Sequence, residues 1–241
     1  MRMVRAVGTV AVLAVDSLRA SWQRQKRRWI AATAIAAATV SLWFVFLHFD
    51  LQSPVSQLER ALQRADGSTL LSMCYPRERE LLGISPDQVN SLLKELYGLL
   101  GVQQIRVRVS GRIIKRLRND RAGAEILVTD SRGETIVLVK ELSKDATNTW
   151  RIDSLSEIFY VLARKAALVH YPQLKGEATP EKRKALQQVI RQFLEARGVH
   201  GVFQVDLRPY PEIAWRIMKD PERGYELIDY NKHTTLLWPD E

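Results

Sequence analysis

The sequence predicts an α+β protein. We expect an N-terminal transmembrane helix, then helices packed on a curved antiparallel sheet of about four strands, and a helical C-terminal extension. Two observations support this class. Residues 29–49 contain no Asp, Glu, Lys or Arg. Apolar residues then recur at helical spacing as far as Gly101, and beyond this glycine they alternate with polar ones, which is the period of a strand.

The uncharged segment is long enough to cross a bilayer. A helix over residues 29–49 would measure about 31 Å at ~1.5 Å per residue, against a hydrocarbon layer of ~30 Å. A signal peptide is a competing interpretation, but its apolar region is shorter and no A-x-A cleavage site follows this one. A buried core helix is the second alternative, and one of this length normally has a polar face. We therefore predict a transmembrane helix.

The flanking charges predict its orientation. Residues 1–28 form a basic tail that carries seven Lys and Arg residues against Asp16 alone. Because basic segments stay in the cytoplasm, the N-terminus is expected inside the cell membrane and residues 50–241 outside the cytoplasm. The tail also supplies most of the formal net charge of +9. The overall charge thus indicates topology, and no nucleic-acid partner is expected.

Three helices are expected before the sheet. Ser53 is a candidate N-cap for the first, with Pro54 at its first position and Gly67 at its end. A short second helix is expected over residues 68–75, and a further turn over residues 77–83. The third helix, over residues 86–100, is capped by Ser85 and carries a leucine-rich apolar stripe.

Four strands follow with connections of hairpin length. They are predicted over residues 104–118, with a break at Gly111, and over residues 124–130, 135–143 and 149–153. Connections this short join antiparallel neighbours. The sequence therefore predicts an antiparallel meander.

Two amphipathic helices follow the meander. Ser154 and Glu157 form a capping box for a helix over residues 155–169, and Thr179 caps one over residues 180–197. We expect residues 156–198 to form an extension that covers the sheet, with docking of a partner as the alternative. Residues 199–241 are expected to be a tail with little regular structure, apart from a short strand at 201–207 and a helix at 211–219.

The order of these elements resembles the nuclear transport factor 2-like superfamily. Members begin with a helix, an acidic-Gly step and a short second helix under a cone-shaped sheet. The residues that match are Ala61, Leu62, Ala65, Asp66 and Gly67. The resemblance covers residues 50–155 and implies a pocket between sheet and helices, which some relatives use for catalysis. The layout is also similar to the single-pass scaffold subunit of type IV secretion systems.

The sequence offers no distinct catalytic, metal or cofactor site. The four histidines, His48, His170, His200 and His233, lie outside residues 50–155. Glu125, Asp130 and Glu141 are the acids that burial within a strand could activate. The alternation of the strand turns Glu125 outward, so a solvated role is favoured. The lone Cys74 lies in an apolar context and is expected to be a buried structural thiol.

The strongest local feature is a basic strip on the first strand and the turn after it. It comprises Arg106, Arg108, Arg112, Lys115, Arg116 and Arg118. Such a strip on a membrane-anchored domain suits anionic lipid headgroups or an acidic partner. The alternative is a solubilising edge that discourages strand-to-strand aggregation.

These features predict a single-pass, membrane-anchored binding or scaffold protein without catalytic activity. Its expected partners are the lipid bilayer and envelope proteins, and it could form a homo-oligomer. An enzyme that uses the pocket of the cone-like domain is the first alternative. A sensor that binds a small ligand or lipid there is the second.

Overall fold

The computed structural model describes residues 38–39, 54–110, 121–145, 147–176, 179–229 and 231–239. The chain divides into two compact units, Met1–Asp50 and Leu51–Glu241. The basic tail lies outside the described residues. Of the predicted membrane helix, only Ala38 and Thr39 are described, and both are helical. Within the described ranges, no helix combines the length and apolar character that crossing a membrane requires.

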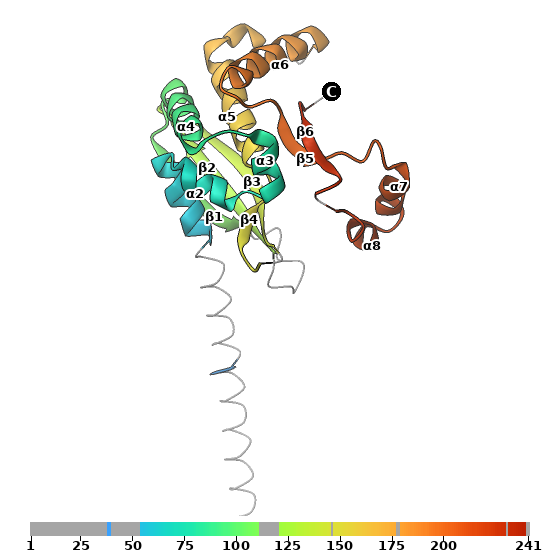
Figure 1. Cartoon of the computed structure of the whole chain (residues 1–241). Coiled ribbons are helices and arrows are strands. Elements are labelled where there is room, and N and C mark those ends of the chain that lie inside the picture. Colours follow the sequence, from blue (N-terminus) through green and yellow to red (C-terminus); the bar gives the residue numbers. More distant parts are fainter. Residues whose placement is uncertain are drawn as a thin grey trace, which may run out of the picture. The chain divides into compact units, whose positions relative to one another are not determined.

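The second unit is α+β, with a four-stranded antiparallel sheet and several helices, as predicted (Figure 1). Residues 54–64 are helical, and this helix ends at Ala65, whose φ of 50° is left-handed. Its end therefore precedes the predicted one at Gly67. Asp66 instead caps α2 (Gly67–Met73), because its carboxylate accepts hydrogen bonds from the backbone N–H and the hydroxyl of Thr69.

Gly67 allows α2 to approach α4 closely. A Cβ atom at this position would overlap the carbonyl oxygen of Pro86 and the side chains of Val89 and Asn90. The backbone N–H of Gly67 also donates to Oδ1 of Asn90. A glycine is thus required here for close packing between two helices, and its φ is not in the left-handed region.

The next two helices have clear local signals. The turn expected after Pro76 is a complete helix, α3 (Pro76–Leu82), which ends at Gly83 with a left-handed φ of 60°. Helix α4 (Pro86–Leu100) begins with a full capping box between Ser85 and Gln88 and ends at left-handed Gly101. The apolar stripe of α4 is buried, as its spacing predicted.

The sheet is the predicted meander. Its strands follow one another in the order of the sequence. They are β1 (Gln104–Ser110), β2 (Arg121–Thr129), β3 (Thr135–Lys144) and β4 (Trp150–Ile152). Neighbours pair in register, for example Val107 with Ile126 and Ile126 with Leu138. These three side chains are all buried, so the alternation places one face of the sheet in the core.

The exposed edge of β1 is closed by side chains of the helix over residues 54–64. Oε2 of Glu59 accepts a hydrogen bond from the backbone N–H of Val107, at 2.9 Å. Nε2 of Gln63 donates to the carbonyl oxygen of Ile105, at 2.8 Å. An edge strand normally offers such groups to other chains, and here two side chains occupy them.

The core continues past the boundary expected at residue 155. Helix α5 (Leu155–His170) packs against α4, and Leu155, Phe159 and Leu162 are fully buried in the main apolar cluster. After the 3₁₀ turn η1 (Pro172–Leu174), α6 (Pro180–Glu195) packs on α5, and it buries Ile190 and Leu194. Residues 156–198 thus share one hydrophobic core with the sheet and the first helices.

The C-terminal region contains more regular structure than predicted. The strand and the helix expected there are β5 (Val202–Val205) and α7 (Pro211–Lys219). Two further elements follow them in the chain, α8 (Pro221–Tyr225) and β6 (Thr234–Leu237). Strand β6 pairs antiparallel with β5. Helix α8 has only five residues, too few to show a helical period, and β6 is held by pairing and by the burial of Trp238.

Candidate functional site

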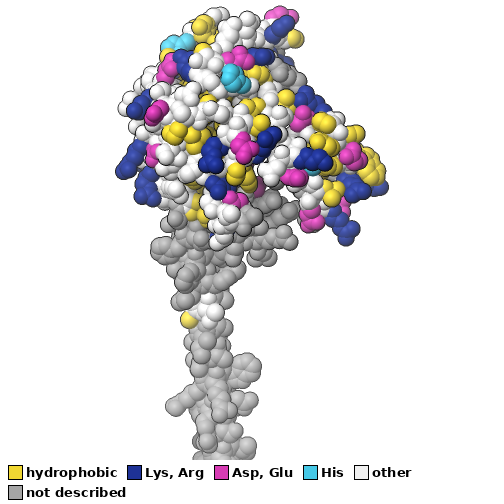
Figure 2. Space-filling model, viewed as in Figure 1, with side chains coloured by type: hydrophobic (Ala, Val, Ile, Leu, Met, Phe, Trp, Pro, Cys, Tyr) yellow, Lys and Arg dark blue, Asp and Glu magenta, His cyan; other side chains and the backbone are white. Residues whose placement is uncertain are grey.

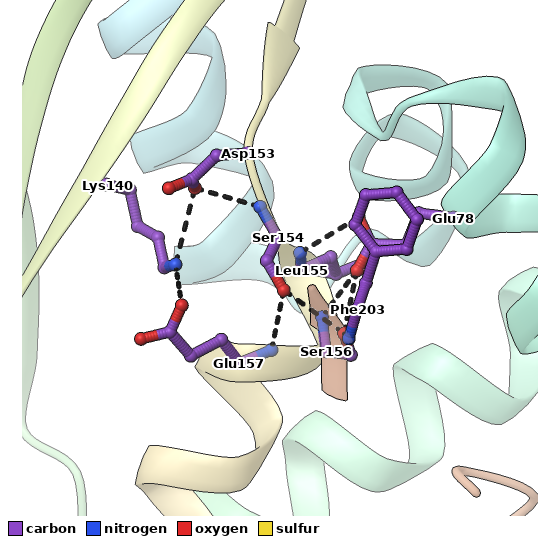
Figure 3. A network of polar contacts seen from close by, with 8 residues as sticks. All are labelled: Glu78, Lys140, Asp153, Ser154, Leu155, Ser156, Glu157 and Phe203. Atoms are coloured by element: carbon purple, nitrogen blue, oxygen red, sulfur yellow. Dashed lines mark hydrogen bonds and ion pairs between the residues drawn. The ribbon is translucent and has the colours of Figure 1, made fainter. Parts of the chain in front are cut away.

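A buried carboxylate lies where α3, α5 and β5 meet. Glu78 of α3 is completely buried (Figure 3). Its Oε1 accepts hydrogen bonds from the backbone N–H and the hydroxyl of Ser156, at 2.9 and 2.8 Å, and its Oε2 accepts one from the N–H of Leu155, at 3.2 Å. Glu78 therefore satisfies free N–H groups in the first turn of α5, where a negative charge is also favoured.

Ser156 extends this contact to the C-terminal ribbon. Its hydroxyl, which donates to Glu78, accepts a hydrogen bond from the backbone N–H of Phe203 in β5, at 2.8 Å. The hydroxyl of Ser154 caps α5 as predicted, because it accepts from the N–H of Glu157. Only this half of the predicted capping box forms, since the side chain of Glu157 turns to another partner.

That partner is Lys140, which lies on the inner side of β3. Its side chain is only 2% exposed, and its Nζ contacts Glu157 and, at 3.3 Å, Oδ1 of Asp153. Asp153 also accepts a hydrogen bond from the backbone N–H of Ser154. The polar network thus joins β3, the start of α5, α3 and β5, as Figure 3 shows.

The network contains acids, a lysine and serines, as many catalytic clusters do, but its Glu78 and Lys140 side chains are buried. Burial raises the pKa of Glu78, and the hydrogen bonds from Ser156 and Leu155 oppose that rise. Burial also raises the pKa of Cys74 well above its ordinary value, with the charge of Glu78 adding to the effect. The thiol donates to the carbonyl oxygen of Leu70 and is buried, as predicted for a structural cysteine.

A groove of about 510 Å³ lies between α4, α5 and α6, away from this network. Its apolar lining includes Leu99, Ala163, Ala166, Ala167, Val189, Ile190 and Phe193. The small alanine side chains of α5 leave space against α6. Between the sheet and the first helices, the aliphatic side chains of Leu62, Leu93 and Ile126 are buried in the main apolar core.

Polar side chains border the groove. The guanidinium group of Arg197 donates to the carboxylate of Glu95, to Oε2 at 2.6 Å, and to the carbonyl oxygen of Phe193. It also lies over the Phe193 ring, 3.7 Å from the centroid. The hydrogen bonds from Arg197 lower the pKa of Glu95. His170 and Tyr171, which follow one another at the end of α5, also line the groove.

Two residues of the predicted basic strip are described. Arg106 and Arg108 are both exposed on β1, as the alternation predicted, and Nε of Arg108 pairs with Oε2 of Glu125 at 2.7 Å. Val137 and Val139 of β3 are exposed as well, at 56% and 47%. The remaining members, Arg112, Lys115, Arg116 and Arg118, lie outside the described residues.

The other candidate acids and histidines have structural positions. Asp130 is buried and accepts hydrogen bonds from the backbone N–H groups of Arg132 and Glu134, which fixes the turn before β3. His233 is buried, and its Nδ1 accepts from the N–H of Asp229. His200 is exposed, Glu141 is half-buried, and His48 lies outside the described residues.

Glu78 and Lys140 were not predicted as site residues, although the sequence carries a signal for both. Lys140 stands two residues from Leu138 and from Leu142, so the strand alternation already places it on the buried face. Glu78 stands four residues before Leu82, and these are the two buried positions of α3. Among the described residues, no three His, Cys, Asp or Glu side chains are grouped as metal ligands would be.

Comparisons with protein-family models, with characterised proteins and with solved structures found no significant match to this chain.

Proposed function

We propose that this chain is a single-pass, membrane-anchored binding protein without catalytic activity, whose residues 50–241 lie outside the cytoplasm. The uncharged run over residues 29–49 and the basic tail before it support the anchor and its orientation. The element order from helices to meander supports a nuclear transport factor 2-like domain within this region. The layout of tail, anchor and domain favours a scaffold role among envelope proteins.

We propose a protein without catalytic activity because its buried titratable side chains are engaged in structural contacts. Glu78, Asp130, Lys140 and His233 are the buried titratable Asp, Glu, Lys and His side chains in the described part of the chain. Each makes structural hydrogen bonds or ion pairs. An acid–base catalyst needs such a group at the wall of a substrate pocket. Here these groups hold turns and helix ends together. His233 also lines a shallow hollow, but its Nδ1 is occupied by the backbone N–H of Asp229.

A second candidate function is the binding of a small apolar ligand in the groove between α4, α5 and α6. The apolar lining and the polar groups of Arg197, Glu95 and His170 at its border favour a molecule with an apolar body and a polar end. Native mass spectrometry of the purified full chain tests this function. A retained small molecule should be lost in the Ala163→Phe variant, in which the groove is filled.

Chemical crosslinking of the full chain in membranes of its own cells tests the binding role. We expect a discrete crosslinked complex that survives detergent extraction. The exposed groove position Gln192 and the exposed position Lys94 on α4 provide a matched pair of sites for a photo-crosslinking residue. A chain that stays monomeric at both sites, and that copurifies with no envelope component, contradicts the proposal.

A further inference from the structure

Helices α7 and α8 expose an unusual amount of apolar surface. Trp215 is 54% exposed, Met218 77% and Leu227 41%. Helix α7 has no buried residue, although its apolar and charged side chains are well separated. In Figure 2, hydrophobic side chains gather over this region among basic and acidic ones. We call Trp215, Met218 and Leu227 the α7–α8 patch.

The patch is a fixed feature because the two helices pack closely. Gly224 of α8 lies against the backbone of Ile217, and a Cβ atom on this glycine would overlap it. The side chain of Asp220 caps α8 by accepting from the N–H of Arg223. Trp215 and Leu227 consequently line one shallow hollow together, and Met218 neighbours Trp215 one turn along α7.

The chemistry of the patch suits the boundary between lipid headgroups and acyl chains. The Nζ of Lys219 lies 4.6 Å from the centroid of the Trp215 ring, so an aromatic body and a cationic tip are presented together. Charges of both signs border the hollow that holds Trp215 and Leu227, with Arg216, Lys219 and Arg223 beside Asp220 and Glu226. Contact with a membrane would therefore depend on apolar insertion and not on anionic lipid.

The proposed anchor keeps the patch near a bilayer. Four residues, 50–53, stand between the uncharged run and residue 54, the first described residue of the second unit. Four residues span at most about 14 Å, at ~3.5 Å per residue. A folded unit of this size has a radius of gyration of about 16 Å. The chain length thus limits how far the second unit can lie from the proposed anchor, which gives the patch a high effective concentration at the bilayer.

We propose that the α7–α8 patch inserts into the headgroup boundary of the membrane that holds the chain, as a second and reversible lipid contact. This inference rests on the proposed membrane anchor. The occupant is the bilayer itself, so a protein partner or a second copy on this patch would be a different outcome.

The test uses the full chain in liposomes, with a spin label at one cysteine at a time. Met218→Cys reports on the patch, Lys184→Cys on exposed α6, and Trp43→Cys on the proposed anchor. Cys74 stays unlabelled because it is buried and its pKa is raised. We expect the label at 218 to lose access to a water-soluble nickel complex but to keep access to oxygen, equally in phosphatidylcholine and with added phosphatidylglycerol.

Each outcome is decisive. The label at 184 should remain accessible to nickel, and Trp215→Gln with Leu227→Gln should return the label at 218 to water. A label at 218 that is fully accessible to nickel while the label at 43 is protected overturns the inference but leaves the anchor intact. If the label at 43 is accessible as well, the proposed anchor itself fails. Protection at 218 only at high protein density assigns the patch to a second copy and also overturns the inference.

Discussion

The carboxylate of Glu78 and the hydroxyl of Ser156 lie 2.8 Å apart, and through this contact α3 holds the first turn of α5 and the ribbon that begins at β5. Three segments far apart in the chain therefore depend on one buried acid. The polar network is best understood as a structural junction, because a carboxyl group buried this completely is stable only when its oxygens have hydrogen-bond partners.

Substitution of Glu78 should destabilise the fold strongly. In Glu78→Gln, an amide NH₂ group replaces an oxygen that accepts from Leu155 or Ser156, so donors face one another in a dry site. We expect a loss of about 2–4 kcal/mol in the free energy of unfolding. Urea unfolding of the full chain in detergent measures it. Glu80→Gln, on the exposed side of the same helix, is the matched control, and an equal loss there would refute the junction.

The same residue predicts a direction of pH dependence. Burial raises the pKa of Glu78 above its ordinary value of 4.5, so the folded chain holds this proton at a pH where the unfolded chain has lost it. The contribution of Glu78 to the free energy of unfolding is fully present below pH 4.5. It falls as the pH rises through the pKa that Glu78 has in the folded chain.

Comparison of the wild type with Glu78→Gln, from about pH 4 to about pH 7, isolates this contribution. The stability difference between them should shrink as pH rises, because only the wild type carries the titrating group. A difference that grows with pH would mean that the folded state prefers the ionised carboxylate.

Two glycines should respond in opposite ways to the same change. Gly67→Ala places a methyl group against Pro86 and Val89, where backbone has to move, and we expect a loss of about 1–3 kcal/mol. Gly98→Ala adds a methyl group in open space within α4, and we expect a gain of about 0.5–1 kcal/mol. Thermal unfolding ranks the variants. Equal effects at both positions would contradict the close approach of α2 and α4.

The covered edge of β1 predicts an aggregation phenotype. Glu59→Ala with Gln63→Ala removes the side chains that hold the backbone groups of Val107 and Ile105. We expect the double variant to self-associate while its secondary structure is kept, because the opened edge can pair with another chain. Light scattering at several concentrations tests this. Arg60→Ala, on the same helix and exposed, should remain unchanged.

The sequence was sufficient where local chemistry decides the structure. Ser85, Ser154 and Thr179 cap their helices as predicted, because a capping side chain acts on the backbone beside it. Strand order and facing also followed from alternation and short turns. Contacts between distant segments were not predicted. Gly67 has the local signature of a helix end, but its role is fixed by α4, more than twenty residues away.

The candidate site was the less predictable part. Glu78 stands among charged neighbours in a segment whose composition indicates exposure, and only the packing of α3 against α5 makes it a buried junction. The groove likewise depends on α6 facing the alanines of α5, a pairing that no local pattern reveals. Of the basic strip, the alternation correctly placed Arg106 and Arg108 on the exposed face.

The membrane anchor is tested most directly by fusion reporters at the C-terminus of the full chain, combined with carbonate extraction of membranes. One reporter should be active only in the cytoplasm and the other only outside it. We expect activity from the extracytoplasmic reporter alone, with the chain kept in the membrane pellet. Activity from the cytoplasmic reporter alone, or release of the chain into the soluble fraction, would contradict the proposed anchor and orientation.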